Sequence, residues 1–250
     1  MLFPEISATL FYELDAMELE MNGNSCDSLH PQQTRKIKPT RRSVSGAFPF
    51  RSEVAIPFES TLERDFLIRS EFFLNVLDII AQPVKIPFTA ASGRTYTYTP
   101  DFLVYYKLGN RDYCDYPKPL LVEVKPEAEW RQNWRKWLPK WKAARRYAIS
   151  QGWEFRIFDE NRIRDTVLTN IRFLDRYKRL TFASSDSQAV LANVSEMGST
   201  QIHYLLARHF MGMYRDSGIA HVWTLIATRQ LDCDMAQPLN EFTEVWIPDD

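Results

Sequence analysis

The sequence predicts a mixed α/β domain followed by a smaller helical domain. The chain has 250 residues, of which 45% are hydrophobic and 14% aromatic, so it can bury a sizeable core. Between residues 60 and 158, short apolar runs lie between two long helical patterns, and after Asp165 the patterns are mainly helical. We therefore expect an extension over residues 1–51, an α/β core with helices on the faces of a sheet over 52–165, and a helical domain over 166–250.

The extension changes charge along its length. Residues 1–34 contain six acidic residues and no Lys or Arg, so we expect no signal peptide with a basic start. Residues 35–42 contain five Lys or Arg with neither helical nor strand periodicity. Arg41 and Arg42 of this arm are candidates for contacts with DNA phosphates, and a solvated linker is an equal alternative.

Cysteine spacing and hydropathy narrow the class of protein. The three cysteines are far apart and form no Cys-x-x-Cys pair, which fits a reducing compartment and argues against structural zinc. No apolar run approaches the length needed to span a bilayer. We expect a cytoplasmic protein with no membrane partner.

The core begins with a helix expected from Ser60 to about Leu77, which has overlapping apolar rows and no internal Gly or Pro. Its start, Ser60-Thr61-Leu62-Glu63, fits a capping box, in which the glutamate bonds back to the N-cap amide. Helix capping is therefore one expected role of Glu63.

Strands follow this helix. Val84–Phe88 and Thr95–Thr99 flank a turn at Ser92-Gly93, and Phe102–Tyr106 is a further apolar run. After a polar loop, Leu120–Lys125 forms the next strand, which Pro126 ends because it lacks a ladder donor.

Two carboxylates and a lysine in these strands predict a catalytic site. Side chains alternate along a strand, so Val122 and Val124 can enter a core while Glu123 and Lys125 share the other face. Asp101 would lie beside Glu123 if the two apolar segments pair in a hairpin. Such oxygens suit Mg²⁺ in metal-dependent phosphodiester hydrolysis. The alternative is a solvated strand edge with a Glu–Lys salt bridge.

A second long helix is expected from about Glu129 to Gln151, interrupted or restarted near Pro139 and capped by Gly152, before a strand over Trp153–Phe158. Its tryptophans recur at spacings of three and four, which favours a place in the core over base stacking. The basic residues between them are candidates for DNA contact, with a solvated face as the alternative: Arg131, Arg135, Lys136, Lys140, Lys142, Arg145 and Arg146.

The last 85 residues predict four helices and a final strand. This order indicates a winged-helix-like domain, and its acidic final segment is unfavourable near phosphates, so a protein-binding role is expected. Three histidines, His203, His209 and His221, have no close ligand spacing. The expected helices are Thr166–Leu180, Asp186–Val194, Thr200–Tyr214 and Ile219–Arg229, and the strand is Thr243–Ile247.

Four segments in order carry a resemblance to a known family. Glu59–Glu63, Gln82–Val84, Tyr98–Val104 and Val122–Lys125 resemble the N-terminal domain of the TnsA endonucleases of heteromeric, TnsABC-type cut-and-paste transposons, which include CRISPR-associated ones. The resemblance spans about residues 52–164, and the later helices are similar to the C-terminal domain of that family. Some members have Gln where this chain has Glu123.

The resemblance implies a restriction-endonuclease-like fold with PD-(D/E)xK chemistry. It implies a nuclease that cuts the 5′ strand of double-stranded DNA at each transposon end, while a TnsB-type DDE transposase cuts the 3′ strand. A TnsC-type AAA+ ATPase is the expected partner of the C-terminal domain. Two other hypotheses remain: a stand-alone restriction-type or repair endonuclease, and a non-catalytic assembly factor.

Roles for the site residues follow from this chemistry. Asp101, Glu123 and Glu63, with the backbone carbonyl of Val124, are the candidate ligands of Mg²⁺ or Mn²⁺, with two ions expected. Lys125 would position or deprotonate the attacking water, because the pKa of a desolvated lysine can fall.

Overall fold

A computed structural model of the chain describes residues 31, 33–34, 44–90, 92–109, 111–212 and 215–248. A four-stranded sheet in the order β3-β6-β7-β8 lies at its centre. Its strands are β3 (Val76–Ala81), β6 (Phe102–Tyr106), β7 (Leu120–Val124) and β8 (Glu154–Phe158). The first three pair antiparallel, whereas β7 and β8 are parallel because helix α3 (Glu127–Ser150) connects them.

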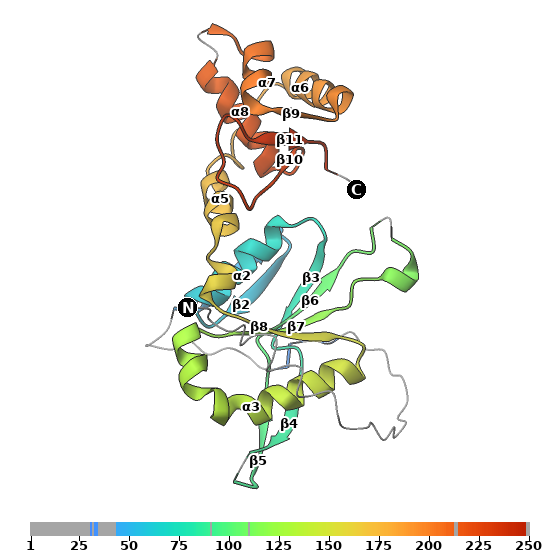
Figure 1. Cartoon of the computed structure of the whole chain (residues 1–250), viewed down its shortest axis with the longest axis vertical. Helices are drawn as coiled ribbons and strands as arrows, with labels where there is room; N and C mark the ends of the chain where they lie inside the picture. Colours follow the sequence, from blue (N-terminus) through green and yellow to red (C-terminus); the bar gives the residue numbers. More distant parts are fainter. Residues whose placement is uncertain are drawn as a thin grey trace, which may run out of the picture. The chain divides into compact units, whose positions relative to one another are not determined.

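Each face of the sheet has its own apolar core. Side chains of α3 pack on one face together with the hairpin of β4 (Ile86–Thr89) and β5 (Thr95–Tyr98). The other face is covered by helix α2 (Thr61–Phe72) and by the hairpin of β1 (Gly46–Phe50) and β2 (Val54–Phe58). Figure 1 shows α2 and α3 on either side of the sheet. The expected mixed α/β core is confirmed.

The β1–β2 hairpin was not anticipated, and β1 lies before the expected core boundary at residue 51. Its turn depends on Arg51 and Ser52, which have φ angles of 48° and 60°, and the Glu53 amide donates to the Phe50 carbonyl at 3.1 Å. Two successive residues with positive φ characterise a type I′ turn, whose twist matches that of the paired strands.

The first expected helix is shorter than the sequence indicated. α2 ends at Phe72, Phe73 is extended, and β3 begins at Val76, so the assignment of helix up to Leu77 is wrong. The apolar residues after Phe73 include β-branched residues that pack well on a sheet, and Val76 and Ile79 enter the core beneath α2. Among the described residues from Ser60 to Phe158, the order is therefore one α-helix, five strands with the short 3₁₀ helix Tyr113–Asp115 before the last of them, a second α-helix and a strand.

Helix α3 runs without a break through Pro139, so the expected interruption is also wrong. A proline inside a helix removes one hydrogen bond and costs about 3 kcal/mol. Packing on the sheet offsets this cost, since Trp141, Ala144 and Ala148 are buried on that face. The predicted core position of the tryptophan stripe is confirmed, because Trp141 is buried in this cluster and Trp130, Trp134 and Trp137 are half-buried against it.

The C-terminal region has its own core. Helix α4 (Glu160–Ile163) precedes it and packs through Ile163 in the core that covers the α2 face of the central sheet. Among the described residues, the C-terminal region contains α5 (Thr166–Asp175), α6 (Ser184–Met197), α7 (Ile202–His209), α8 (Arg215–Ala227) and a sheet in the order β10-β11-β9. The strands are β9 (Ser199–Gln201), β10 (Asp232–Cys233) and β11 (Glu244–Trp246).

All four helices expected here exist with different bounds: α6 extends beyond Asp186–Val194 at both ends, and α8 begins and ends before the expected Ile219–Arg229 helix. α5 ends at Asp175 instead of Leu180, and α7 occupies only part of the expected Thr200–Tyr214 helix. The start of that segment is β9, because Thr200 pairs with Val245 of β11. The winged-helix-like character of this region stays a prediction.

Candidate functional site

Asp101 and Glu123 lie side by side, as the expected hairpin requires. β6 and β7 pair antiparallel with Phe102 opposite Val122, and the Asp101 amide donates to the Val122 carbonyl at 3.0 Å. The Asp101 Oδ2 atom in turn accepts the Val124 amide at 2.7 Å. Main-chain pairing therefore fixes the position of the first carboxylate at the start of β6.

Strand alternation places Glu123 on the α3 face of the sheet. Val122 and Val124 enter the core beneath α2, as predicted, whereas the Glu123 side chain is only 1% exposed. Lys125 lies between the carboxylates, with its Nζ atom 3.6 Å from Asp101 Oδ2 and 3.8 Å from Glu123 Oε1. The solvated strand edge of the alternative is wrong, because β7 is an inner strand and Glu123 is buried, whereas the Glu–Lys salt bridge of that alternative is present.

Burial and mutual repulsion shape the protonation of this cluster. Burial first, and then the charge of Glu123, raise the pKa of Asp101 well above its usual range. Burial lowers the pKa of Lys125, but the charges of Asp101, Glu123 and Glu63 outweigh it and raise this pKa above the ordinary value. Without a metal ion, the neighbouring carboxylates thus favour the charged form of Lys125, and the expectation that its pKa falls near a metal stays a prediction.

Glu63 caps helix α2. The Ser60 hydroxyl accepts the Glu63 amide at 3.1 Å and donates to Glu63 Oε1 at 2.9 Å. Glu63 Oε2 accepts a hydrogen bond from the Glu59 amide at 2.7 Å, which lies one residue before the N-cap amide used in a capping box. The capping role is confirmed. The charge of this 6% exposed residue also acts on Asp101 and Lys125.

Two donors to Glu123 were not foreseen in this role. The Tyr98 hydroxyl, at the end of β5, donates to Glu123 Oε2 at 2.5 Å, and Lys140 Nζ of α3 lies 2.9 Å from Glu123 Oε1. Tyr98 lies in the segment that carries the resemblance, three residues before Asp101. Lys140 was grouped with the basic residues of α3, and no local pattern separates it from them.

The donor set fits a hard divalent cation. Asp101, Glu123 and the Val124 carbonyl offer oxygen ligands, and a cation would offset the repulsion that raises the pKa of Asp101. Among the described residues, no group of three or more His, Cys, Asp or Glu side chains forms a metal-binding cluster. The three expected carboxylates therefore do not converge on one point, and Glu63 differs from the other two because its oxygens hold the helix start.

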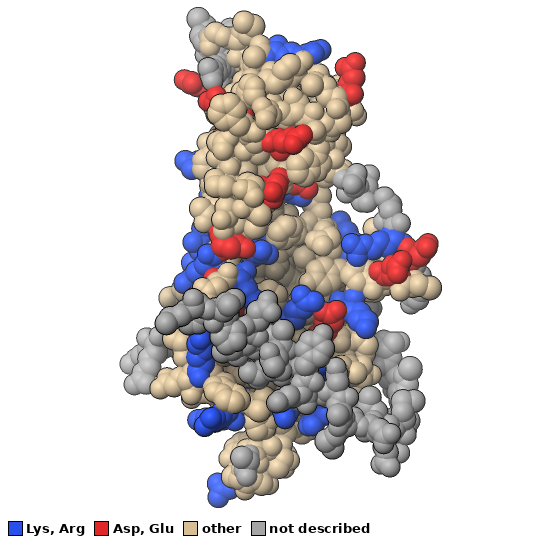
Figure 2. Space-filling model, in the orientation of Figure 1, with Lys and Arg blue, Asp and Glu red and all other residues tan. Residues whose placement is uncertain are grey.

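The other basic residues of α3 face outward more than Lys140 does. Arg131 is 64% exposed and pairs with Glu127, and its guanidinium lies 5.5 Å from the ring of Trp130. Arg135 lies similarly over Trp134, at 5.3 Å. Figure 2 shows blue Lys and Arg side chains over the part of the chain that holds the central sheet. Lys136, Lys142 and Arg146 are exposed and Arg145 half-buried, whereas Arg41 and Arg42 lie outside the described residues.

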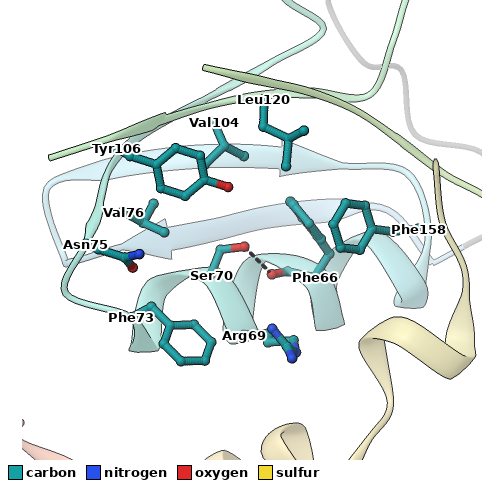
Figure 3. Close-up of a pocket in the computed structure, with 10 residues that line it drawn as sticks. All are labelled: Phe66, Arg69, Ser70, Phe73, Asn75, Val76, Val104, Tyr106, Leu120 and Phe158. Carbon is teal, nitrogen blue, oxygen red and sulfur yellow. Dashed lines mark hydrogen bonds between the residues drawn. The ribbon is translucent and has the colours of Figure 1, made fainter. Parts of the chain in front are cut away.

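A separate pocket of about 250 Å³ lies between α2 and the opposite face of the sheet. Figure 3 shows its mostly apolar lining, in which the Ser70 hydroxyl donates to the Phe66 carbonyl at 2.8 Å. Val104 and Leu120 line it from β6 and β7, and no carboxylate does. This pocket therefore does not belong to the Asp101–Glu123 site.

Two family models match the chain in succession. The TnsA-like endonuclease N-terminal model matches residues 74–160, and the TnsA endonuclease C-terminal model matches residues 162–235. The chain belongs to the TnsA endonuclease family. The N-terminal match contains Asp101, Glu123 and Lys125 but begins after Glu63. A search of the curated proteins found no match.

The TnsA assignment supports the coarse function predicted from the sequence. The family implies a restriction-endonuclease-like fold and a DNA endonuclease that works with other transposase subunits. No helix in the described part of the chain combines the length and the apolar character needed to cross a membrane.

Proposed function

We propose that this TnsA protein hydrolyses the 5′-strand phosphodiester at transposon ends, in a reaction that depends on Mg²⁺ or Mn²⁺. The observation that carries the proposal is the buried cluster in which Lys125 lies within 4 Å of both Asp101 and Glu123. A TnsB-type DDE transposase and a TnsC-type AAA+ ATPase are the proposed partners. Family membership supports the DNA substrate and the assembly with transposase subunits.

The residues of this chain have separable tasks in the proposed reaction. Asp101, Glu123 and the Val124 carbonyl would hold one or two ions, and Glu63 would act on the site through its charge. Divalent cations supply neutralising charge at the phosphate and hydroxide at neutral pH. The Lys125 ammonium donates hydrogen bonds, so it orients the attacking water and stabilises negative charge on the phosphate oxygens. Burial of the cluster strengthens these interactions because it excludes bulk water.

A matched pair of aspartate variants tests the proposal. Asp101→Asn keeps the size of the side chain and removes its charge, and exposed Asp112→Asn is the control. In a system reconstituted with the transposase and the ATPase, strand-specific cleavage is read on denaturing gels. We expect Asp101→Asn to lose at least about 100-fold in 5′-strand cleavage, equivalent to about 2.7 kcal/mol, and Asp112→Asn to match the wild type.

Two outcomes would contradict the proposal. Unchanged 5′-strand cleavage by Asp101→Asn would refute the assignment of Asp101 to the catalytic site. Cleavage of plain duplex DNA by the purified protein alone, with Mg²⁺, would identify a stand-alone endonuclease.

We also propose that residues 166–250 form a winged-helix-like domain that binds the ATPase. Two exposed apolar side chains support a protein partner, since Met211 is 74% and Phe242 70% exposed. Acidic residues near Phe242, such as Glu244, disfavour DNA at this surface. Phe242→Ser should weaken co-purification with the ATPase and leave DNA binding by the nuclease domain unchanged; equal co-purification would contradict this assignment.

A further inference from the structure

Lys140 has a different environment from the exposed basic residues of α3. Its side chain is 15% exposed, compared with 64% for Arg131 on the same helix. Its ammonium lies 2.9 Å from Glu123 Oε1, within charge-assisted hydrogen-bond distance. A lysine that served only to attract phosphates would be expected to reach solvent, whereas this one points at a candidate metal ligand.

Three aromatic rings surround the Lys140 ammonium. Its Nζ atom lies 4.7 Å from the ring centre of Trp137, 4.8 Å from that of Tyr98 and 5.7 Å from that of Trp141. The electron-rich faces of aromatic rings attract cations within about 6 Å. The rings therefore stabilise the ammonium and shield a side chain that is 15% exposed, and Glu123 is its charged partner.

Tyr98 links this aromatic cage to Glu123 a second time. Its ring faces Lys140, while its hydroxyl donates to Glu123 Oε2. Each oxygen of the Glu123 carboxylate thus has a donor from the chain. A carboxylate oxygen has two lone pairs, so one donor at each oxygen leaves a lone pair for a metal ion. The two donors fix the orientation of a side chain that strand pairing alone leaves free to rotate.

We propose that Lys140, with Tyr98, is a positioning residue of the nuclease site that acts through Glu123 and does not contact the DNA phosphates. The proposal rests on the proposed metal-dependent function. Residues that orient metal ligands typically contribute 10- to 100-fold to metal affinity or activity. We expect an effect of this size, with DNA affinity unchanged.

Three variants separate positioning from phosphate binding. Lys140→Met removes the charge and keeps an unbranched side chain. Tyr98→Phe removes only the hydroxyl oxygen, so it also tests the proposal if Lys140→Met fails to fold. Exposed Lys118→Met, in the loop before β7, is the matched lysine control. Thermal melting identifies which variants are folded.

The measurements separate metal binding, DNA binding and cleavage. Mn²⁺ binding to the full-length protein is measured by titration calorimetry. DNA affinity and its salt dependence are measured in the absence of divalent metal. Single-turnover 5′-strand cleavage is measured in the reconstituted system. For both site variants we expect Mn²⁺ binding and the cleavage rate to fall about 10- to 100-fold, with DNA affinity within about twofold of the wild type. Lys118→Met should match the wild type in all three.

The results that overturn the proposal are distinct from those that overturn the nuclease function. If Lys140→Met weakens DNA binding and lowers its salt dependence while Mn²⁺ binding is unchanged, Lys140 is a phosphate contact. If both site variants behave like the wild type, neither residue positions Glu123. Absence of Mn²⁺ binding to the wild type, together with full cleavage by Asp101→Asn, would instead refute the proposed function itself.

Discussion

Asp65 provides the sharpest stability prediction. This carboxylate of α2 is 1% exposed and accepts hydrogen bonds from Arg164 Nε at 2.7 Å and Arg172 Nη2 at 2.6 Å. Arg172 belongs to α5, so the carboxylate ties the nuclease core to the first long helix of the C-terminal region. Asp65→Asn removes the charge and keeps the size and one oxygen.

The structure bounds the expected loss of stability. Breaking a fully buried ion pair costs about 3–5 kcal/mol. Arg164 and Arg172 are 45% and 51% exposed, so both can rehydrate after the change. We therefore expect Asp65→Asn to lower the free energy of unfolding by about 2–3 kcal/mol. With a urea m-value of about 2–3 kcal/mol/M, the unfolding midpoint should fall by about 1 M.

Urea unfolding followed by circular dichroism measures this shift, and Asp175→Asn is the control. Asp175 is 72% exposed and pairs with Lys178 at 3.5 Å, so its variant should stay within about 0.5 kcal/mol of the wild type. A shift for Asp65→Asn no larger than that of the control would refute the reasoning. A double variant with Arg172→Met should lose less than the sum of the two single losses, because both remove the same contact.

Three further predictions follow from local structure. Ser52→Gly should stabilise the type I′ turn of the β1–β2 hairpin by about 0.5–1 kcal/mol in thermal melting, because glycine adopts a φ of 60° without strain, whereas Glu53→Gly should not stabilise. Burial lowers the pKa of His221, so the unfolded state binds a proton at this residue more tightly than the folded state does. The free energy of unfolding should therefore keep its full value above about pH 6.5 and fall as the pH drops below it, and a His221→Gln variant with the same dependence of stability on pH would contradict this. Burial raises the pKa of Cys233 to about 12, so this thiol should react with iodoacetamide only after unfolding, while exposed Cys114 reacts in the native protein; mass spectrometry distinguishes the two.

The hairpin geometry of the site could be predicted because it depends on local rules. Strand alternation placed Glu123 and Val124 on opposite faces, and the antiparallel pairing of two neighbouring apolar segments placed Asp101 beside Glu123. The helix cap at Ser60 and Glu63 likewise depends on residues three apart. Interactions between residues close in the sequence produce a spacing pattern that can be recognised in a single sequence.

The errors in the fold came from apolar segments whose structure depends on distant partners. Val76 and Leu77 continued the apolar row of α2, and only pairing of β3 with β6 makes them a strand. Pro139 predicted a break that packing of α3 on the sheet overrides. The C-terminal strands contain two or three residues each, too few to show a period.

The environment of Lys140 could not be predicted for the same reason. Along α3 it is one of several basic residues next to tryptophans, and Lys136 lies one turn before it on the same row. Only the sheet brings Glu123 and Tyr98 to its ammonium. The charge pattern therefore identified a basic helix, whereas the role of each lysine depends on its tertiary contacts.

Helix α2 connects the two halves of the molecule through residues one helical turn or less apart. Glu63 caps its start and acts electrostatically on Asp101, while Asp65 binds the arginines that follow the core. Asp65→Asn should lower stability without removing any candidate ligand. It could still disturb Glu63, because both carboxylates lie on the same turn of α2. The cleavage rate of this variant, measured where it stays folded, therefore distinguishes two roles for the junction. An unchanged rate indicates a purely structural junction, and a reduced rate indicates that the junction also holds Glu63 in place near the site.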